Sequence, residues 1–319
     1  MSNLNHTEKK FISNNITLDQ SLGHMKSLVK QYLNIGSYTN ALFYADKLFY
    51  LSLNKELPIV SDHLLDLANC LYLNREYFRC VSLIQKYNMA NYNLKFLNLM
   101  GQALLACEDY EGVINYLDKD FIQVEINEEE NSNFYQSIRF LLIGKAYEMQ
   151  ENKSPAIRNF LNALKYDAGN IEAFESLINH QLLSNEQKQN LKSELTLNHS
   201  NRWLYDYYIS KLEDNIFMTV NSDVIIQPVE NGNIIDLLYT NNDQDFMKIE
   251  AEKFFTARDY TNAYNKLRKI NEDDFYKFDI IPMYCSCMIE LNKIGELYSL
   301  AHKLSNNCSD RYISWFLVV

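Results

Sequence analysis

The chain has 319 residues, with 30 lysines and arginines against 41 aspartates and glutamates, and only 8 glycines and 4 prolines. Nucleic acids and anionic membrane surfaces are recognised chiefly through lysine and arginine, so a net charge of -11 argues against both as partners. The shortage of glycine and proline indicates long helices joined by short turns.

Apolar residues recur with a helical period along most of the chain. Residues 1–20 are polar and are expected to fray. Beyond them, apolar side chains return at i, i+3, i+4 and i+7, as over residues 64–71. Polar clusters such as 34–37 and 151–154 separate these stretches where one helix has to end. The sequence therefore predicts helices throughout, without sustained β alternation.

The predicted helices fall into pairs. The most regular pair carries Gly144, Tyr147, Ala156, Phe160 and Ala163, and these gaps are typical of a tetratricopeptide (TPR) repeat, whose period is about 34 residues. Small residues are needed where two antiparallel helices cross closely, and the aromatic rings fill the space around that contact. The positions equivalent to Gly144 in the other regular units are, in chain order, Val29, Ala68, Gly101, Ala251 and Cys285.

Less regular segments divide the chain. A degenerate unit opens at Phe174, and the acidic segment 125–133 lengthens one step between repeats. Residues 214–245 have the most loop-like composition, which predicts an insertion or hinge between two blocks of repeats. Trp315 stands where the leading aromatic residue of a further repeat belongs, so the last repeat is expected to be cut short.

Together these features predict an all-α TPR solenoid, a right-handed superhelix of about seven repeats with the last one truncated. Its expected parts are a polar N-terminal tail over 1–20, a TPR block over 21–213, the hinge over 214–245, and further TPR repeats over 246–319.

Residues that could carry catalysis do not form a known motif. The sequence contains no glycine-rich phosphate loop, no His-Glu-x-x-His and no paired Cys-x-x-Cys. Asp62 and His63 are adjacent, and adjacent residues on a helix do not face each other, so a capped helix start is the preferred interpretation. Cys285 and Cys287 would point about 200° apart on a helix, which favours packing over metal binding. We expect no enzyme activity, no metal and no cofactor.

Nothing in the sequence suggests a membrane or secretory protein. No apolar run approaches the roughly 20 residues that span a bilayer. The polar start of the chain lacks the apolar core of a signal peptide. We expect the protein in the nucleus and the cytoplasm.

Binding is what a TPR solenoid offers. The first helix of each repeat lines the concave wall, where polar side chains and an aromatic ring suit an extended or helical peptide. The alternative is that these side chains only form a solvated helix face. The terminal-carboxylate clamp of co-chaperone TPR domains is not present, because its third repeat would need cations where Asn98 and Gln102 stand. The candidate groove residues are Lys30, Asn69, Tyr72, Asn98, Gln102 and Lys145.

The first repeat resembles one family in particular. Residues 31–33, Tyr38, 41–47 and 51–52 closely resemble the N-terminal repeat of the sixth subunit of the anaphase-promoting complex, the cell-division-cycle sixteen family. That family usually has Trp at the position of Tyr44. Further similar segments follow in order along the chain: 67–68, 70–73, Tyr77, Arg79, 172–174, Leu177, His180, 290–293, 296–297, 302–304 and 314–316.

The resemblance implies a non-catalytic scaffold subunit of a multisubunit ubiquitin ligase that acts in mitosis. Its partners would be other TPR and scaffold subunits of that complex and a second copy of the chain, because the N-terminal TPR half of the family forms a two-fold dimer. The family's groove for a small accessory subunit lies beyond Val319 and is not carried over. The competing function is a free-standing TPR adaptor that binds a partner peptide in its concave groove.

The aromatic-rich stretch 32–50 supports self-association through the first repeat. Burial of these rings against the second repeat is the alternative. The candidate self-association residues are Tyr32, Phe43, Tyr44, Phe49 and Tyr50.

Overall fold

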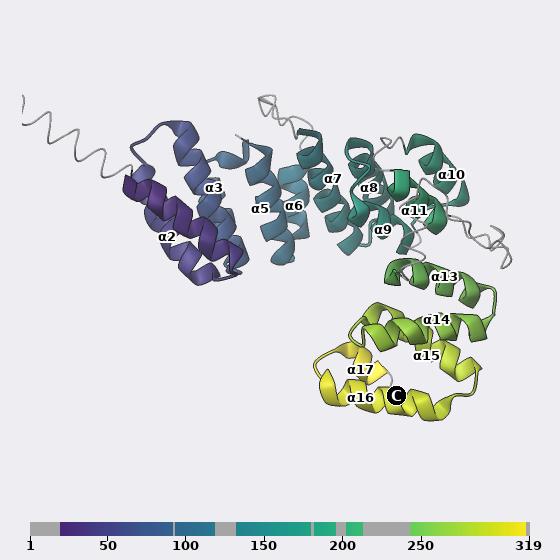
Figure 1. Ribbon diagram of the computed structural model, residues 1–319. Helices are drawn as coiled ribbons and strands as arrows, with labels where there is room; N and C mark the ends of the chain where they lie inside the picture. The colour runs from purple at the N-terminus through teal and green to yellow at the C-terminus, as the bar shows by residue number, and fades with distance from the viewer. Residues whose placement is uncertain are drawn as a thin grey trace, which may run out of the picture. The chain divides into compact units, whose positions relative to one another are not determined.

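The computed structural model describes residues 20–91, 93–118, 132–179, 182–195, 202–212 and 243–316. Every regular element within these ranges is helical, which confirms the predicted all-α class. The chain divides into two compact units, Met1–Leu195 and Thr196–Val319, called unit 1 and unit 2 below. Figure 1 shows successive helices running antiparallel within each unit, as expected for stacked helix pairs.

Unit 1 begins with a helix over residues 20–34. It continues with α2 (Tyr38–Ser52), α3 (Leu57–Leu73), α4 (Tyr77–Lys86), the short 3-10 helix η1 (Met89–Asn91), α5 (Leu94–Ala106), α6 (Tyr110–Leu117), α7 (Ser132–Met149), α8 (Lys153–Tyr166), α9 (Ile171–Asn179) and α10 (Asn185–Glu194). Unit 2 contains α11 (Arg202–Leu212), α13 (Gln244–Thr256), α14 (Tyr260–Asp273), the 3-10 helix η3 (Phe278–Ile280), α15 (Ile281–Glu290), α16 (Ile294–Asn307) and α17 (Tyr312–Phe316).

The turn inside each regular repeat follows one backbone pattern. Seven residues after each position equivalent to Gly144, the chain adopts a positive φ, between 55° and 73°. After α7, for example, Glu151 N donates to Glu148 O over 2.8 Å and Asn152 N donates to Tyr147 O over 2.9 Å. This pair of bonds is the Schellman motif, which satisfies carbonyls left unpaired at a helix end. In these turns the residues with a positive φ are Gly36, Arg75, Glu108, Glu151, Arg258 and Asn292.

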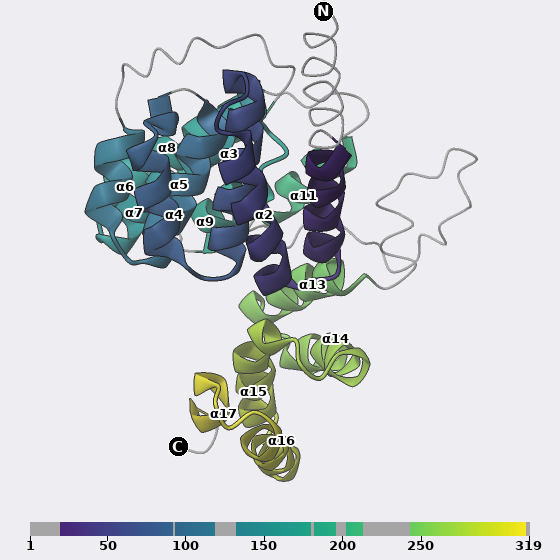
Figure 2. The ribbon, with the colours of Figure 1, turned by 90° about the vertical axis from the view of Figure 1, so that its left-hand side faces the viewer.

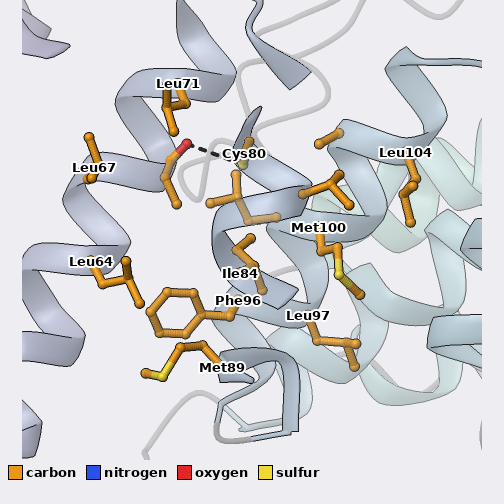
Figure 3. Close-up of a cluster of buried hydrophobic side chains, with 14 of the residues drawn as sticks. Leu64, Leu67, Leu71, Cys80, Ile84, Met89, Phe96, Leu97, Met100 and Leu104 are labelled. Carbon is orange, nitrogen blue, oxygen red and sulfur yellow. Dashed lines mark hydrogen bonds between the residues drawn. The ribbon is translucent and has the colours of Figure 1, made fainter. Parts of the chain in front are cut away.

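The repeats pack through the small residues that the spacing identified. A Cβ atom on Gly144 would lie 2.6 Å from the Phe160 ring, and one on Gly101 would lie 2.7 Å from Leu117. The pairs α7–α8 and α5–α6 therefore pack so closely that glycine fits at these positions and a larger residue does not, because real Cβ contacts are longer than these distances. In the part of the core drawn in Figure 3, the Phe96 ring lies beside Leu64 and Met89, and Cys80 Sγ donates to Ala68 O over 3.4 Å.

Asp62 does not cap a helix start, so that interpretation is wrong. Helix α3 begins at Leu57, with Glu56 at the N-cap and a proline in its first turn. Pro58 defines the start because its ring fixes φ and it has no N–H to leave unpaired. Asp62 and His63 therefore lie in the second turn of α3.

Several predicted segments lie outside the described residues. These are the polar tail apart from its last residue, the segment 125–131 and the hinge over 214–242. The remaining predicted hinge residues, 243–245, include Asp243, whose side chain caps the start of α13. Trp315 lies in the short helix α17, where its Nε1 donates to Ser309 O over 2.7 Å.

Candidate protein-interaction surfaces

Helix α2 exposes a row of aromatic side chains. Phe43 is 59% exposed and Tyr50 is 55% exposed, and the two lie seven residues apart on one helix face. Between them, Lys47 holds its Nζ 5.6 Å from the centre of the Phe43 ring. Large exposed apolar side chains grouped on one face are typical of an interaction surface.

The other predicted aromatic residues support this row from behind. Tyr32 and Tyr44 stack with their ring centres 5.6 Å apart, and both are half-buried. The Phe43 ring lies edge-on to Tyr44 at 5.3 Å. Tyr44 thus supports Phe43 in its outward position. The contact between Tyr44 and Tyr32 joins α2 to the first helix of the repeat.

Phe49 was expected on the self-association surface, and this expectation is wrong. Its ring is 0% exposed and packs edge-on against Tyr87 at 5.3 Å. Each residue of an α-helix is rotated by about 100° from the one before it, so Phe49 faces the core while Tyr50 faces outward. The alternative interpretation, burial against the second repeat, therefore holds for Phe49.

A hollow of about 520 Å³ lies beside Tyr44. Its remaining walls come from one side of the first helix, chiefly His24, Met25 and Leu28. The sequence interpretation overlooked these residues, although Met25 and Leu28 repeat at the i, i+3 spacing that identifies a helix face. Tyr44 thus contacts the protruding Phe43 ring and also lines the hollow.

The groove candidates differ in how accessible they are. Lys30 is exposed, and Asn69, Tyr72, Gln102 and Lys145 are half-buried. The Lys145 ammonium pairs with the Glu172 carboxylate of α9. These five side chains keep part of their polar surface open to solvent, as a peptide-binding wall requires.

Asn98 is not accessible, so its place in the predicted groove is wrong. It is 5% exposed, and its Nδ2 donates to Tyr135 O of α7 over 2.8 Å. The bond ties α5 to α7, which pack directly against each other. Residues on the side of α5 that meets the next repeat lie inside the stack, and a pattern confined to one helix does not reveal this.

The cysteines have the properties of packing residues. Burial raises the pKa of Cys70, Cys80 and Cys285 to about 12, and that of Cys287 to about 11. A thiol with so high a pKa carries little reactive thiolate at neutral pH. No group of three or more potential metal ligands occurs among the described residues. Over the same ranges, no helix is long and apolar enough to cross a bilayer.

Comparison with known proteins finds sequence similarity to subunits of one complex. Residues 34–120 match the family model described as "Anaphase-promoting complex, cyclosome, subunit 3". The human "Cell division cycle protein 16 homolog" is 25% identical over 93% of this chain and 49% of its own length. The Arabidopsis thaliana "Anaphase-promoting complex subunit 6" is 24% identical over 94% of this chain and 58% of its own length. The predicted resemblance to the sixth subunit is thereby confirmed.

A solved structure supports the fold in the same way. The crystal structure of the APC/C hetero-tetramer Cut9–Hcn1 contains a chain that superposes with a TM-score of 0.74 at 20% identity, covering 93% of this chain and 55% of that one. At this identity the similarity shows the fold, a TPR solenoid. The chain spans about half the length of the human relative that it matches.

Proposed function

We propose that this chain is a non-catalytic scaffold subunit of the anaphase-promoting complex, the ubiquitin ligase of the cell cycle, acting in the nucleus and the cytoplasm. The observation that carries the proposal is the similarity to sixth-subunit proteins of that complex along 93% of the chain. Two features of the described residues agree with a scaffold role. Their cysteines are buried, or protonated in the case of Cys107, whose pKa is raised chiefly by burial. Their exposed aromatic residues offer a surface for protein contacts.

We further propose that the first repeat joins two copies of the chain. An isologous contact needs one patch that complements itself. The first repeat offers a projecting ring, Phe43, beside the hollow at Tyr44, so each copy can place its ring in the hollow of the other. Aromatic side chains of this kind dominate the energetics of many interfaces.

Light scattering over a concentration series tests the dimer. We expect a dimer at tens of micromolar for the unaltered chain, and a monomer for the double variant Phe43→Ser, Tyr50→Ser. The matched control is Phe78→Ser on α4, which removes a ring that is 77% exposed on another helix of the same unit. A monomeric unaltered chain, or a control that dissociates equally, would rule out this interface.

The alternative function is a free-standing TPR adaptor that captures a peptide in its concave groove. The partly open polar side chains of Asn69, Gln102 and Lys145 favour it. Purification of the tagged protein from cells separates the two functions. Recovery of other ligase subunits supports the scaffold, whereas recovery of a chaperone or receptor without them supports the adaptor.

A further inference from the structure

Unit 2 contains a hollow that none of the predicted sites includes. Helix α15 packs against both α14 and α16, and the three helices surround a space of about 380 Å³. This volume falls within the range of roughly 300–1,000 Å³ that is usual for ligand pockets. Glu272, Tyr284 and Glu296, one from each helix, provide polar walls.

One wall of the hollow presents a hydrogen-bond acceptor. Tyr264 donates its hydroxyl proton to the Glu296 carboxylate. The Tyr284 ring stacks on that of Tyr264 at 5.5 Å. The ionised carboxylate of Glu296 has further lone pairs but no proton to offer a ligand.

The same wall is held in place. Tyr284 is 5% exposed, and Lys293 lies with its Nζ 3.8 Å from the centre of the Tyr264 ring. The Tyr264 hydroxyl first, and then Lys293, hold the pKa of Glu296 below its usual value. Glu296 is therefore ionised at neutral pH and fixed on two sides before any ligand arrives, which reduces the cost of binding.

Two carboxylates of the hollow can receive a cation. Its lining contains Glu272 and Glu296 together with one ammonium group, Lys303. Arg268 pairs with Glu272 over 2.8 Å, and Lys293 pairs with Glu296 over 3.3 Å. Both pairs are exposed, and exposed pairs are weak, so a ligand's cation can share these carboxylates.

The remaining lining combines Asn271 and Ser299 with three apolar side chains. Met288 and Leu300 are buried side chains of α15 and α16, and Phe275 adds a half-buried ring beyond the end of α14. A surface of this kind suits the methylene stem of a long side chain, and the ring offers a face to its cation.

We infer that this hollow binds a basic side chain, arginine or lysine, of a partner protein. The stem packs on Met288, Leu300 and Phe275, and the charged end donates to Glu296 and Glu272. This goes beyond the proposed scaffold function, which assigns nothing to this part of unit 2, and does not depend on it.

The test uses the full chain with ¹³C-labelled methionine methyl groups. Met288 lies in the hollow, and the other methionines of the chain serve as internal references. The Met288→Leu variant identifies its signal. We expect acetyl-Ala-Arg-Ala-amide to shift the Met288 signal saturably, and the uncharged citrulline analogue to leave it in place. The matching pair, the lysine peptide and its acetyl-lysine form, should show the same contrast.

Two variants with opposite charge changes complete the test. Glu296→Gln should weaken binding of the arginine peptide roughly two- to fivefold, and Lys303→Gln should strengthen it by about as much. The control is Glu290→Gln, the same substitution at an exposed site outside the hollow, which should change nothing. Circular dichroism verifies that each variant is folded. The inference is overturned if neutral and charged peptides act alike, if Met288 does not respond, or if Lys303→Gln fails to strengthen binding.

Discussion

At the scale of single residues, most turns inside the repeats place a residue other than glycine in the left-handed backbone conformation, although glycine adopts it most easily. Of the six described turns with this pattern, only the first has glycine, Gly36. The left-handed region brings a Cβ atom close to the following carbonyl, which costs about 1–2 kcal/mol for most residues. The other five turns are held by their Schellman bonds and by the packing of the helices on either side.

We predict that Glu151→Gly stabilises unit 1. Glu151 has a φ of 60°, and glycine removes the Cβ conflict there while keeping both backbone bonds. The expected gain is about 0.5–1 kcal/mol in the free energy of unfolding, measured with urea. Glu111→Gly, at an exposed position in the first turn of α6, is the control and should lose about 0.5–1 kcal/mol, because glycine loses more backbone entropy and the acidic side chain favours a helix N-terminus. A loss of stability in Glu151→Gly would show that its side chain contributes more than its backbone costs.

At the scale of elements, a buried chain of hydrogen bonds joins three consecutive helices. Ser137 of α7 donates its hydroxyl to Ala163 O of α8 over 2.8 Å. Asn170 donates from Nδ2 to the Ser137 hydroxyl over 2.8 Å, and its Oδ1 accepts from Ala173 N at the start of α9 over 3.2 Å. One asparagine thus caps α9 and links it to the repeat before it.

We predict that Asn170→Ala destabilises unit 1 by about 1–3 kcal/mol, because it removes a helix cap and takes away a buried partner of Ser137. The control is Asn152→Ala. Asn152 is the N-cap of α8, but its side chain makes no capping bond, so its loss should cost little. Chemical unfolding followed by circular dichroism measures both variants. Equal losses in the two would contradict the assigned role of Asn170.

At the scale of the whole molecule, the chain forms two compact units, with their boundary at Leu195 and Thr196. Each has its own hydrophobic core, one centred on residues such as Phe96 and Met100, the other on Tyr264 and Leu267. Repeats in a solenoid contact mainly their neighbours, so damage to one repeat should spread only a short way.

We predict that Gly144→Ala weakens unit 1 alone. Its new Cβ atom would meet the Phe160 ring at 2.6 Å, which should cost about 1–3 kcal/mol. Hydrogen exchange should rise in α7 and α8 and remain unchanged in α14, α15 and α16. Gly295→Ala on α16 is the control, because nothing lies within 4 Å of its Cβ position. Faster exchange across both units would show that they unfold together.

The sequence by itself determined the helix pairs, their turns and the resemblance to one subunit. Small residues such as Gly101 and Gly144 recur at fixed offsets, because each repeat solves the same local packing problem. Tertiary structure alone decided which side chains remain available. Phe49 and Asn98 lie on helix faces that the next repeat covers, and the hollow of unit 2 exists only where α14, α15 and α16 meet. Burial depends on which helices stack together, and the spacing of apolar residues within one helix does not reveal those neighbours.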